Sequence, residues 1–416
     1  MPDKVNNPQI RFEGFTDAWE QRKLDEVFDC TVPNNTLSRA ELSFDEGTVL
    51  NVHYGDVLIK YGSVLDVQKD DIPRIPHRCR EDFNGALLQD GDVIIADTAE
   101  DETTGKACEI SNSQGSAIVS GLHTMVFRPR HRMALGYLGY YLNSNAYHHQ
   151  LLPLMQGIKV LSLSRSNIQK TSVTYPIEVK EQKFIANYFS QLDRLITLHQ
   201  HKYDKLQILK KAMLEKMFPK NGSSVPEIRF KGFTDAWEQR KLGDCFTERC
   251  ESMPDGELIS VTINDGIKKF SELGRHDNSN DDKSKYKKVC AGDIAYNSMR
   301  MWQGASGCSP YEGIVSPAYT VLTPNSGINS KCMAYQFKLP ATIHTFKINS
   351  QGITSDNWNL KFPALSEIEI YVSPYEQEQA KIAAYFANLD HLITLHQREL
   401  EKLQNIKKSM LEKMFV

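Results

Sequence analysis

Two nearly identical stretches, each free of Pro and Gly, dominate this sequence. The first occupies residues 181–218 and reads EQKFIANYFSQLDRLITLHQHKYDKLQILKKAMLEKMF; the second occupies residues 378–415 and reads EQAKIAAYFANLDHLITLHQRELEKLQNIKKSMLEKMF. They are identical at 25 of 38 positions. Apolar residues recur in both at intervals of three and four, which predicts a long amphipathic helix. About 34 residues at roughly 1.5 Å each make a rod of roughly 50 Å.

The apolar residues of each predicted helix fall on heptad rows. The expected a-type row of the first helix contains Ile185, Leu192, Leu206 and Met213. The d-type row contains Tyr188, Leu195 and Leu209, and the residues that widen the stripe are Phe189, Ile196, Tyr203 and Met217. The second helix repeats the two rows with Ile382, Leu389, Leu403 and Met410, and with Tyr385, Leu392 and Ile406. Because such a stripe on a lone rod would face water, we expect the two helices to pack together as a coiled coil.

His199 and His396 lie on the a-type row of the two helices. A buried polar residue that fixes the register of the helices is the favoured interpretation. A pH switch or a metal-binding pair is the alternative.

A shorter block is also repeated, upstream of each helix. Residues 8–28 read PQIRFEGFTDAWEQRKLDEVF and residues 226–246 read PEIRFKGFTDAWEQRKLGDCF, with 16 of 21 positions identical. The segments between the short and long blocks, roughly 29–180 and 247–377, share little. Near-identical blocks around divergent inserts favour one architecture that presents two different surfaces, over a recent duplication with even drift.

The divergent segments have a mixed pattern. GDVLIKYG (55–62), GDVIIAD (91–97) and GDIAYNS (292–298) are predicted strands that a Gly-Asp turn introduces. Residues 133–152 and 330–346 are predicted to be helical. Each segment is therefore expected to be an α+β domain with a small sheet.

Composition bounds the class of protein. A chain of 416 residues predicts two or three domains, and 40% hydrophobic with 24% charged residues is typical of globular proteins. The sequence has no expected signal peptide or membrane span, and its eight cysteines form no Cys-x-x-Cys pair, so we expect a cytoplasmic protein. The net charge of −3 does not by itself indicate a nucleic-acid binder.

Signatures of catalysis are missing from the sequence. It contains no phosphate-binding P-loop, no Gly-x-Gly-x-x-Gly after a strand, no His-Glu-x-x-His, no Gly-x-Ser-x-Gly and no tetrapeptide of the amino-methyltransferase kind. The tripeptide 178–180, Glu-Val-Lys, resembles the end of a nuclease motif, but no partner Asp precedes it on a plausible strand. We therefore expect no catalytic and no metal-binding residues on this chain.

Recognition chemistry remains. Residues 296–303 follow a predicted strand and offer amide, guanidinium and indole groups that suit base edges; residues 97–106 are their counterpart. Residues 156–165 and 351–358 form a second pair of strips that suits phosphate contact. These strips, together with two residues at the end of the first Gly-Asp-led strand, supply the candidate DNA-binding residues. They are Lys60, Tyr61, Thr98, Thr104, Lys106, Lys159, Ser164, Arg165, Asn297, Ser298, Arg300, Trp302, Gln303, Ser355 and Asn357.

Three features together resemble the specificity subunit of type I restriction-modification systems. They are the doubled IRFxGFTDAWEQRKL block, the Gly-Asp-led strand in each half, and the Pro–Glu-Gln–helix junctions at 176–182 and 374–379. The resemblance covers essentially the whole chain. It implies an α+β fold in which two pseudo-symmetric target recognition domains are separated by two long helices in an antiparallel coiled coil that sets the gap between two DNA half-sites.

The resemblance also implies partners and a division of labour. Two methyltransferase (modification) subunits and two restriction/translocase subunits would join this chain on double-stranded DNA, with S-adenosylmethionine, ATP and Mg²⁺ bound by those partners. The expected domains are 8–178, 226–375 and the helices 179–220 and 376–416. Residues 29–155 contain 10 basic and 17 acidic residues, so the first domain must segregate its charge or depend on a partner for positive surface.

Two other classes of function stay open from the sequence. One is a coiled-coil scaffold whose divergent domains bind proteins or peptides. The other is a self-sufficient nuclease or methyltransferase. Salt-dependent duplex binding separates the first from a DNA reader, and activity with Mg²⁺ or S-adenosylmethionine alone would reveal the second.

Overall fold

The computed structural model describes residues 7–220, 222–263, 266–277, 279–354 and 357–416. It divides into two compact units, Met1–Gln200 with Arg398–Val416, and His201–Gln397. Two helices of 38 residues, α6 (Val179–Lys216) and α11 (Glu376–Lys413), each contribute one end to each unit. The two repeated long blocks therefore form helices as the sequence predicts, and the α+β fold class is confirmed. None of the described helices is long and apolar enough to cross a membrane.

The first unit is built around a five-stranded sheet in the order β2-β10-β6-β8-β4. Its strands are β2 (Phe28–Asp29), β10 (Thr124–Pro129), β6 (Val93–Ala96), β8 (Ala107–Ser111) and β4 (Val64–Asp66). A second sheet has the order β5-β3-β9, with β5 (Arg74–Ile75), β3 (Val49–Val52) and β9 (Ala117–Ser120). The helices of this unit besides α6 and α11 are α1 (Leu24–Val27), α2 (Tyr54–Ile59), α3 (Tyr137–Leu142), α4 (Asn145–His148) and α5 (Arg165–Ile168).

The second unit has a four-stranded sheet in the order β14-β21-β18-β19. Its strands are β14 (Phe246–Glu248), β21 (Tyr319–Pro324), β18 (Ile294–Asn297) and β19 (Ser306–Cys308). Two further pairs are β15 (Ile259–Thr262) with β16 (Gly266–Lys269), and β17 (Lys287–Val289) with β20 (Gly313–Val315). Its short helices are α7 (Leu242–Cys245), α8 (Ser330–Gln336), α9 (Pro340–Ile348) and α10 (Phe362–Ser366).

The repeated short block has the same role in both units. It supplies an edge strand that pairs antiparallel with the last strand before the long helix: β1 (Glu20–Lys23) with β12 (Ser172–Tyr175), and β13 (Glu238–Lys241) with β22 (Glu369–Val372). A short helix follows the edge strand in each unit. Near-identical sequence thus builds one framework twice.

Two details of the sequence interpretation are wrong. Residues 55–59 of the predicted strand 55–62 belong instead to the helix α2, because the His53 side chain accepts the N–H of Gly55 and starts a helical turn. Leu195 and Leu209, predicted for the buried d-type row, are 42% and 38% exposed. The seam of α6 follows the predicted a-type row, in which Ile185 and Leu192 are buried, together with the row that the sequence analysis treated as a widening of the stripe, which includes the fully buried Phe189.

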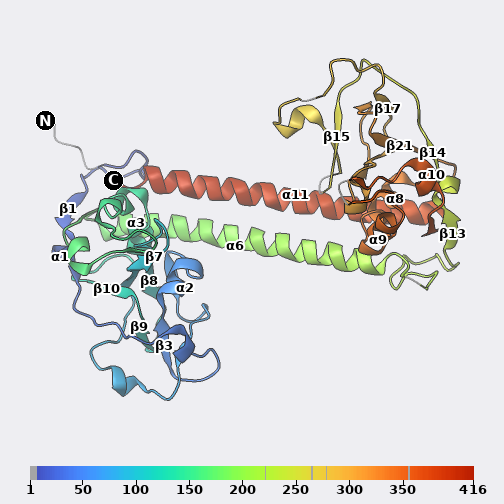
Figure 1. The fold of residues 1–416 in the computed structure, drawn as a ribbon. Helices are drawn as coiled ribbons and strands as arrows, with labels where there is room; N and C mark the ends of the chain where they lie inside the picture. The colour runs from blue at the N-terminus through green and yellow to red at the C-terminus, as the bar shows by residue number, and fades with distance from the viewer. Residues whose placement is uncertain (1–6, 221, 264–265, 278, 355–356) are drawn as a thin grey trace. The chain divides into compact units, whose positions relative to one another are not determined.

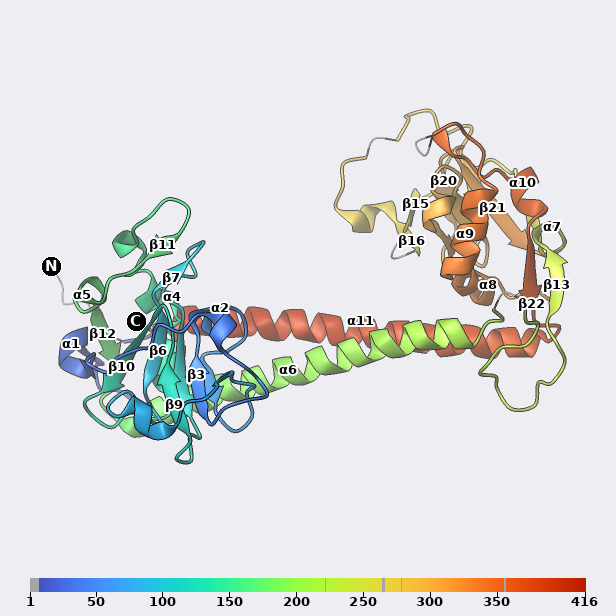
Figure 2. The ribbon, with the colours of Figure 1, turned by 60° about the horizontal axis from the view of Figure 1, so that its bottom comes forward.

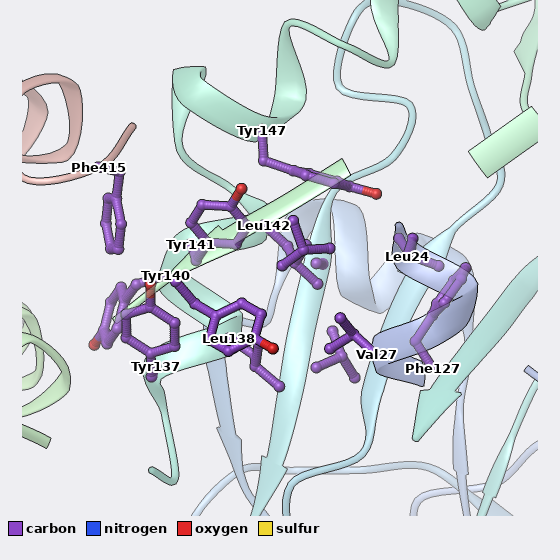
Figure 3. Packing of buried hydrophobic residues seen from close by; sticks show 14 of the residues in the cluster. Leu24, Val27, Phe127, Tyr137, Leu138, Tyr140, Tyr141, Leu142, Tyr147 and Phe415 are labelled. Atoms are coloured by element: carbon purple, nitrogen blue, oxygen red, sulfur yellow. The ribbon is translucent and has the colours of Figure 1, made fainter. Parts of the chain in front are cut away.

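Within each unit the ends of α6 and α11 lie side by side and run antiparallel (Figures 1 and 2). In the first unit the Phe415 ring stacks on Phe189 at 5.7 Å between centroids, and in the second Phe218 stacks on Phe386 at 6.1 Å. Figure 3 shows Phe415 beside the tyrosines of α3, with Tyr141 at 5.6 Å. In each unit, therefore, the last aromatic residue of one long block packs against the start of the other long block and completes the core.

A polar cluster beside each stack has the same chemistry. Asp193 accepts the hydroxyl of Tyr140 at 2.8 Å and contacts the ammonium of Lys407 at 2.5 Å. Asp390 accepts the hydroxyl of Tyr335 at 2.7 Å and contacts the ammonium of Lys210 at 2.5 Å. Because these pairs occupy matching positions of the two long blocks, they fix the same antiparallel register in both units.

A buried ion pair ties the short block to the long helix. In the first unit Arg11 donates to both carboxylate oxygens of Glu181, at 2.7 and 2.8 Å. In the second unit Arg229 donates to both oxygens of Glu378, at 2.6 and 2.9 Å. The glutamate side chains are 2% and 0% exposed, so their charge depends on the bidentate partner.

Removing either glutamate should destabilise the protein strongly. Glu181→Ala and Glu378→Ala each leave a guanidinium without its buried partner, and each should lower the free energy of unfolding by about 3–5 kcal/mol. Glu367→Ala, which breaks an exposed pair with Lys241, is the control and should cost less than about 1 kcal/mol. Urea unfolding of the three variants measures this, and equal losses in all three would contradict the assignment.

Another buried carboxylate has no such cationic contact among its hydrogen bonds. Glu109 on β8 is 1% exposed and accepts the backbone N–H groups of Gly136 at 2.7 Å and Gly139 at 2.9 Å. Burial disfavours the charged carboxylate more than these donors favour it, and raises the pKa of Glu109 to about 7 from an ordinary value of 4.5.

This pKa predicts a pH dependence of stability. Since the folded state holds the proton of Glu109 up to a higher pH than the unfolded state, the free energy of unfolding should fall as pH rises from 4.5 to about 7, by about 3 kcal/mol in total. Glu109→Gln cannot titrate. Urea unfolding of both proteins between pH 5 and 8 should show a weaker fall in the variant, and identical pH profiles would refute the assignment.

Candidate nucleic-acid interface

In the first unit, the two candidate strips form one continuous surface. Strand β7 (Thr98–Ala99) pairs antiparallel with β11 (Leu161–Ser162), and Figure 2 shows the two strands side by side. Next to this pair, the N–H of Leu163 donates to the carbonyl of Asp97 at 2.8 Å. The strips 97–106 and 156–165, some sixty residues apart in sequence, are therefore neighbours in space.

Three candidate residues of this surface are accessible. Lys159 is exposed at the turn of the second strip. Ser164 is exposed and caps α5, where its hydroxyl accepts the N–H of Asn167 at 3.3 Å. Thr98 is half-buried and donates to the carboxylate of Asp97 at 2.7 Å.

The other candidates of the first unit are held by the protein itself. Tyr61 and Thr104 are buried, and burial raises the pKa of the Tyr61 hydroxyl far above its ordinary value. The Lys106 ammonium donates to the carbonyl of Leu58 at 2.8 Å, and burial lowers its pKa. Lys60 pairs with the Asp71 carboxylate at 2.9 Å, and the Arg165 guanidinium donates to the carbonyl of Cys30 at 2.6 Å.

The second unit brings its two strips together in the same way. Beyond β18, the carbonyl of Ser298 accepts the N–H of Leu360 at 2.9 Å. The rings of Trp302 and Trp358 meet edge to face, with centroids 5.2 Å apart. The strip 296–303 is thus anchored to the end of the strip 351–358, and the aromatic pair marks the junction.

Several polar groups surround the tryptophan pair. Arg300 is exposed, while Gln303 and Asn297 are half-buried. The side-chain oxygen of Asn297 accepts the N–H of Met299 at 3.0 Å, and the same side chain hydrogen-bonds to Tyr319. Asn357 is exposed, and Ser355 lies outside the described residues. The buried Ser298 hydroxyl bonds to Thr320 at 2.9 Å and holds the strip from below.

The structure adds residues that the motif analysis did not select. His123 in the first unit has a positive φ of 54° and lies 3.2 Å from the Asp97 carboxylate, with its ring 5.3 Å from that of Tyr54. In the second unit Lys287, Asn359 and Lys361 line a hollow of about 420 Å³ beside Ser298. These residues come from neighbouring strands and turns, so no local sequence pattern could place them here.

A tight glycine turn shapes the second strip in both units. Gln156 and Ser162 bond to each other at 3.0 and 2.8 Å through their backbones, as do Gln351 and Asn359. Gly157 and Gly352, each next to the glutamine, have φ values of 131° and 147°. A Cβ atom would lie 1.9 Å from the Val160 carbonyl oxygen in the first turn and 2.6 Å from the Asn357 carbonyl oxygen in the second, so both turns require glycine.

The geometry defines a chain with two framework-matched domains that present unlike polar surfaces, which is the organisation of a modular recognition protein. The type I restriction modification DNA specificity domain family matches residues 16–208 and again residues 234–405. The chain belongs to this family, in agreement with the resemblance that the sequence motifs carry.

Two known proteins illustrate the relationship. A Methanocaldococcus jannaschii protein named as the specificity subunit of type I restriction enzyme MjaX is 24% identical over 197 residues, which cover 45% of this chain and 42% of that one. The match thus spans less than half the length of this relative. The crystal structure of a type I restriction-modification S subunit from M. genitalium has a similar fold, with a TM-score of 0.60, 14% identity and 99% coverage of both chains.

Substituting either turn glycine should loosen its hairpin. Gly157→Ala and Gly352→Ala should weaken the turn by about 1–3 kcal/mol, because the new methyl group meets backbone and the φ is unfavourable. The amide hydrogens of Ser162 and Asn359, respectively, should exchange at least tenfold faster. Gly62→Ala, which meets nothing within 4 Å, is the control. Unchanged exchange in the two turn variants would contradict the glycine requirement.

Proposed function

We propose that this chain reads a bipartite site on double-stranded DNA and directs methylation and restriction of that DNA by partner subunits. The observation that carries the proposal is the repeated construction of the candidate surface. In each unit two sequence-distant strips meet beside the same sheet framework, but the side chains they present differ. One scaffold with two unlike polar surfaces suits the reading of two unlike half-sites.

The second unit offers the chemistry of direct base readout. The Arg300 guanidinium suits the N7 and O6 acceptors of guanine, and the amides of Asn297 and Gln303 suit adenine edges. The Trp302 ring, held by Trp358 at 5.2 Å, supplies a flat face at the same place. Asn357 and Ser355 belong to the adjoining strip, and we assign them to contacts with the DNA backbone or with bases.

The first unit offers smaller and more scattered donors. Lys159, Ser164 and Thr98 are the accessible members of its surface. Lys60 bonds to the carbonyl and the carboxylate of Asp71, and Arg165 bonds to the carbonyl of Cys30; N–H donors remain on each group for phosphate. Tyr61, Thr104 and Lys106 contribute indirectly, because they hold in place the backbone that carries these donors.

Charge supports a shared interface with partner subunits. In the first unit Arg39, Lys69 and Arg128 are already paired with aspartates, at 2.6–2.7 Å. These three cations are therefore committed to the protein's own carboxylates, although strong DNA affinity depends on neutralising many phosphates. Two methyltransferase subunits are proposed to supply the rest of the positive surface, and two restriction/translocase subunits to complete the assembly.

We propose the division of labour that the family resemblance implies. Methyl transfer from S-adenosylmethionine, and translocation and cleavage with ATP and Mg²⁺, are assigned to the partner subunits, and this chain is assigned no catalytic step. The helices α6 and α11 are proposed to set the spacing of the half-sites. DNA recognition by this chain would then determine where all of these reactions occur.

A chain with two copies of one reader tests the proposal. Replacing residues 247–377 by a second copy of 29–180 keeps both repeated frameworks and removes one surface. Expressed with its methyltransferase, this chain should methylate sites composed of two copies of the first half-site, because each segment reads one half alone. Genome-wide methylation mapping, with the natural chain as reference and the reciprocal replacement as the matched control, measures the result.

Two results would overturn the proposal. One is a change in both half-sites after replacement of a single segment. The other is methylation that is unaltered in both chimeras although they assemble. In the second case the divergent segments would bind proteins, and duplex binding by the complex would not depend on them.

A further inference from the structure

Two isoleucines are the most exposed large apolar side chains of the described residues. Ile158 in the first unit is 101% exposed and Ile353 in the second is 98% exposed. Complete exposure forgoes the stabilisation that burial of such a side chain contributes. A single exposed apolar residue is ordinary, but the same exposure at matching places in two domains suggests a common binding partner.

The two isoleucines occupy equivalent turns. Each follows the glycine of a Gln-Gly-Ile tripeptide, at 156–158 and at 351–353, although the surrounding segments share little sequence. The backbone bonds that close the two turns, at 3.0 and 2.8 Å in both cases, join Gln156 to Ser162 and Gln351 to Asn359. The glycines allow these turns to close tightly, and each isoleucine directly follows the glycine of its turn.

The surroundings of each isoleucine favour DNA over an apolar protein groove. Ile158 is followed by the exposed Lys159, and β11 of its hairpin pairs with the strand that carries Thr98. At the base of the other turn the Lys347 ammonium lies 5.4 Å from the centre of the Trp358 ring, which contacts Trp302. An apolar side chain with a cation beside it, and in the second unit with aromatic rings as well, suits a polyanion whose bases offer apolar faces.

We propose that Ile158 and Ile353 are wedge residues, each of which enters a base step of the DNA half-site that its own unit reads. This inference rests on the proposed function and deepens it. Apolar side chains at such positions part neighbouring base pairs and kink the duplex. Enzymes that modify a base must take it out of the stack, and a side chain that fills the opened step lowers the cost of doing so.

The test uses the complex of the full chain with its methyltransferase and a duplex that carries the methylated site. Ile158→Ala should weaken binding about tenfold, as expected for the loss of roughly 1.4 kcal/mol of apolar contact. The slope of log affinity against log salt should stay unchanged, because isoleucine neutralises no phosphate. Lys159→Ala is the contrasting variant and should reduce that slope by about 1.

Position along the site gives the sharper result. With 2-aminopurine placed next to the methylated base of one half-site, the natural complex should increase its fluorescence on binding. Ile158→Ala should abolish the increase in the first half-site only, and Ile353→Ala in the second only. Ile158→Leu should restore it, and Ile177→Ala, which removes a 63% exposed isoleucine outside both hairpins, should leave it intact.

Two results would overturn the wedge. One is full 2-aminopurine signal and affinity in both alanine variants. The other is loss of methyltransferase assembly in these variants with normal DNA affinity in whatever complex forms, which would assign the hairpins to a protein interface. Neither result would contradict the proposed function, because site-specific methylation by the natural chain would persist. The proposed function itself would be overturned if the natural complex showed no site-specific DNA binding.

Discussion

The packing of the last aromatic residue of each long block against the start of the other long helix completes the core of each unit. Phe415 stacks on Phe189 and Phe218 stacks on Phe386, so neither unit has a complete core without two segments that are distant in sequence. The Asp193–Lys407 and Asp390–Lys210 contacts fix the register of these stacks. Burial of the aromatic side chains supplies most of the free energy of this packing. The charged pairs select one alignment of two otherwise repetitive helices.

This closure explains why the framework can stay constant while the recognition surface varies. The repeated blocks supply the contacts that both units share: the edge strand, the Arg–Glu pair and the aromatic stack. The strips at 97–106 and 156–165 lie outside those blocks and touch one another through backbone bonds between β7 and β11. Side chains on the strips can therefore change with little cost to the core, which is what a reader of variable sequences requires.

The sequence predicted the two repeated helices and the strands within 91–97 and 292–298, but it did not show which residues are buried or which distant segments meet. A period of three and four residues predicted α6 and α11, but the same period left two rows possible, and only packing showed that Leu195 is exposed while Phe189 is buried. Residues 55–62 have the composition of a strand, yet a side-chain cap at His53 makes 55–59 helical. The meeting of Trp302 with Trp358 depends on the path of the whole chain between them, which no local pattern contains.

The joining of Ile10 to Lys413 has an evolutionary consequence. The N–H of Ile10 donates to the carbonyl of Lys413 at 3.0 Å in the first unit, and the N–H of Ile228 donates to the carbonyl of Lys216 at 2.9 Å in the second. In the second unit a short stretch of chain links the end of α6 to the short block that it contacts. In the first unit the end of α11 contacts the short block without such a direct link along the chain. Since the same contact forms both ways, an ancestral half-length polypeptide could have assembled as a symmetric homodimer, and gene fusion would have joined its copies before their readers diverged.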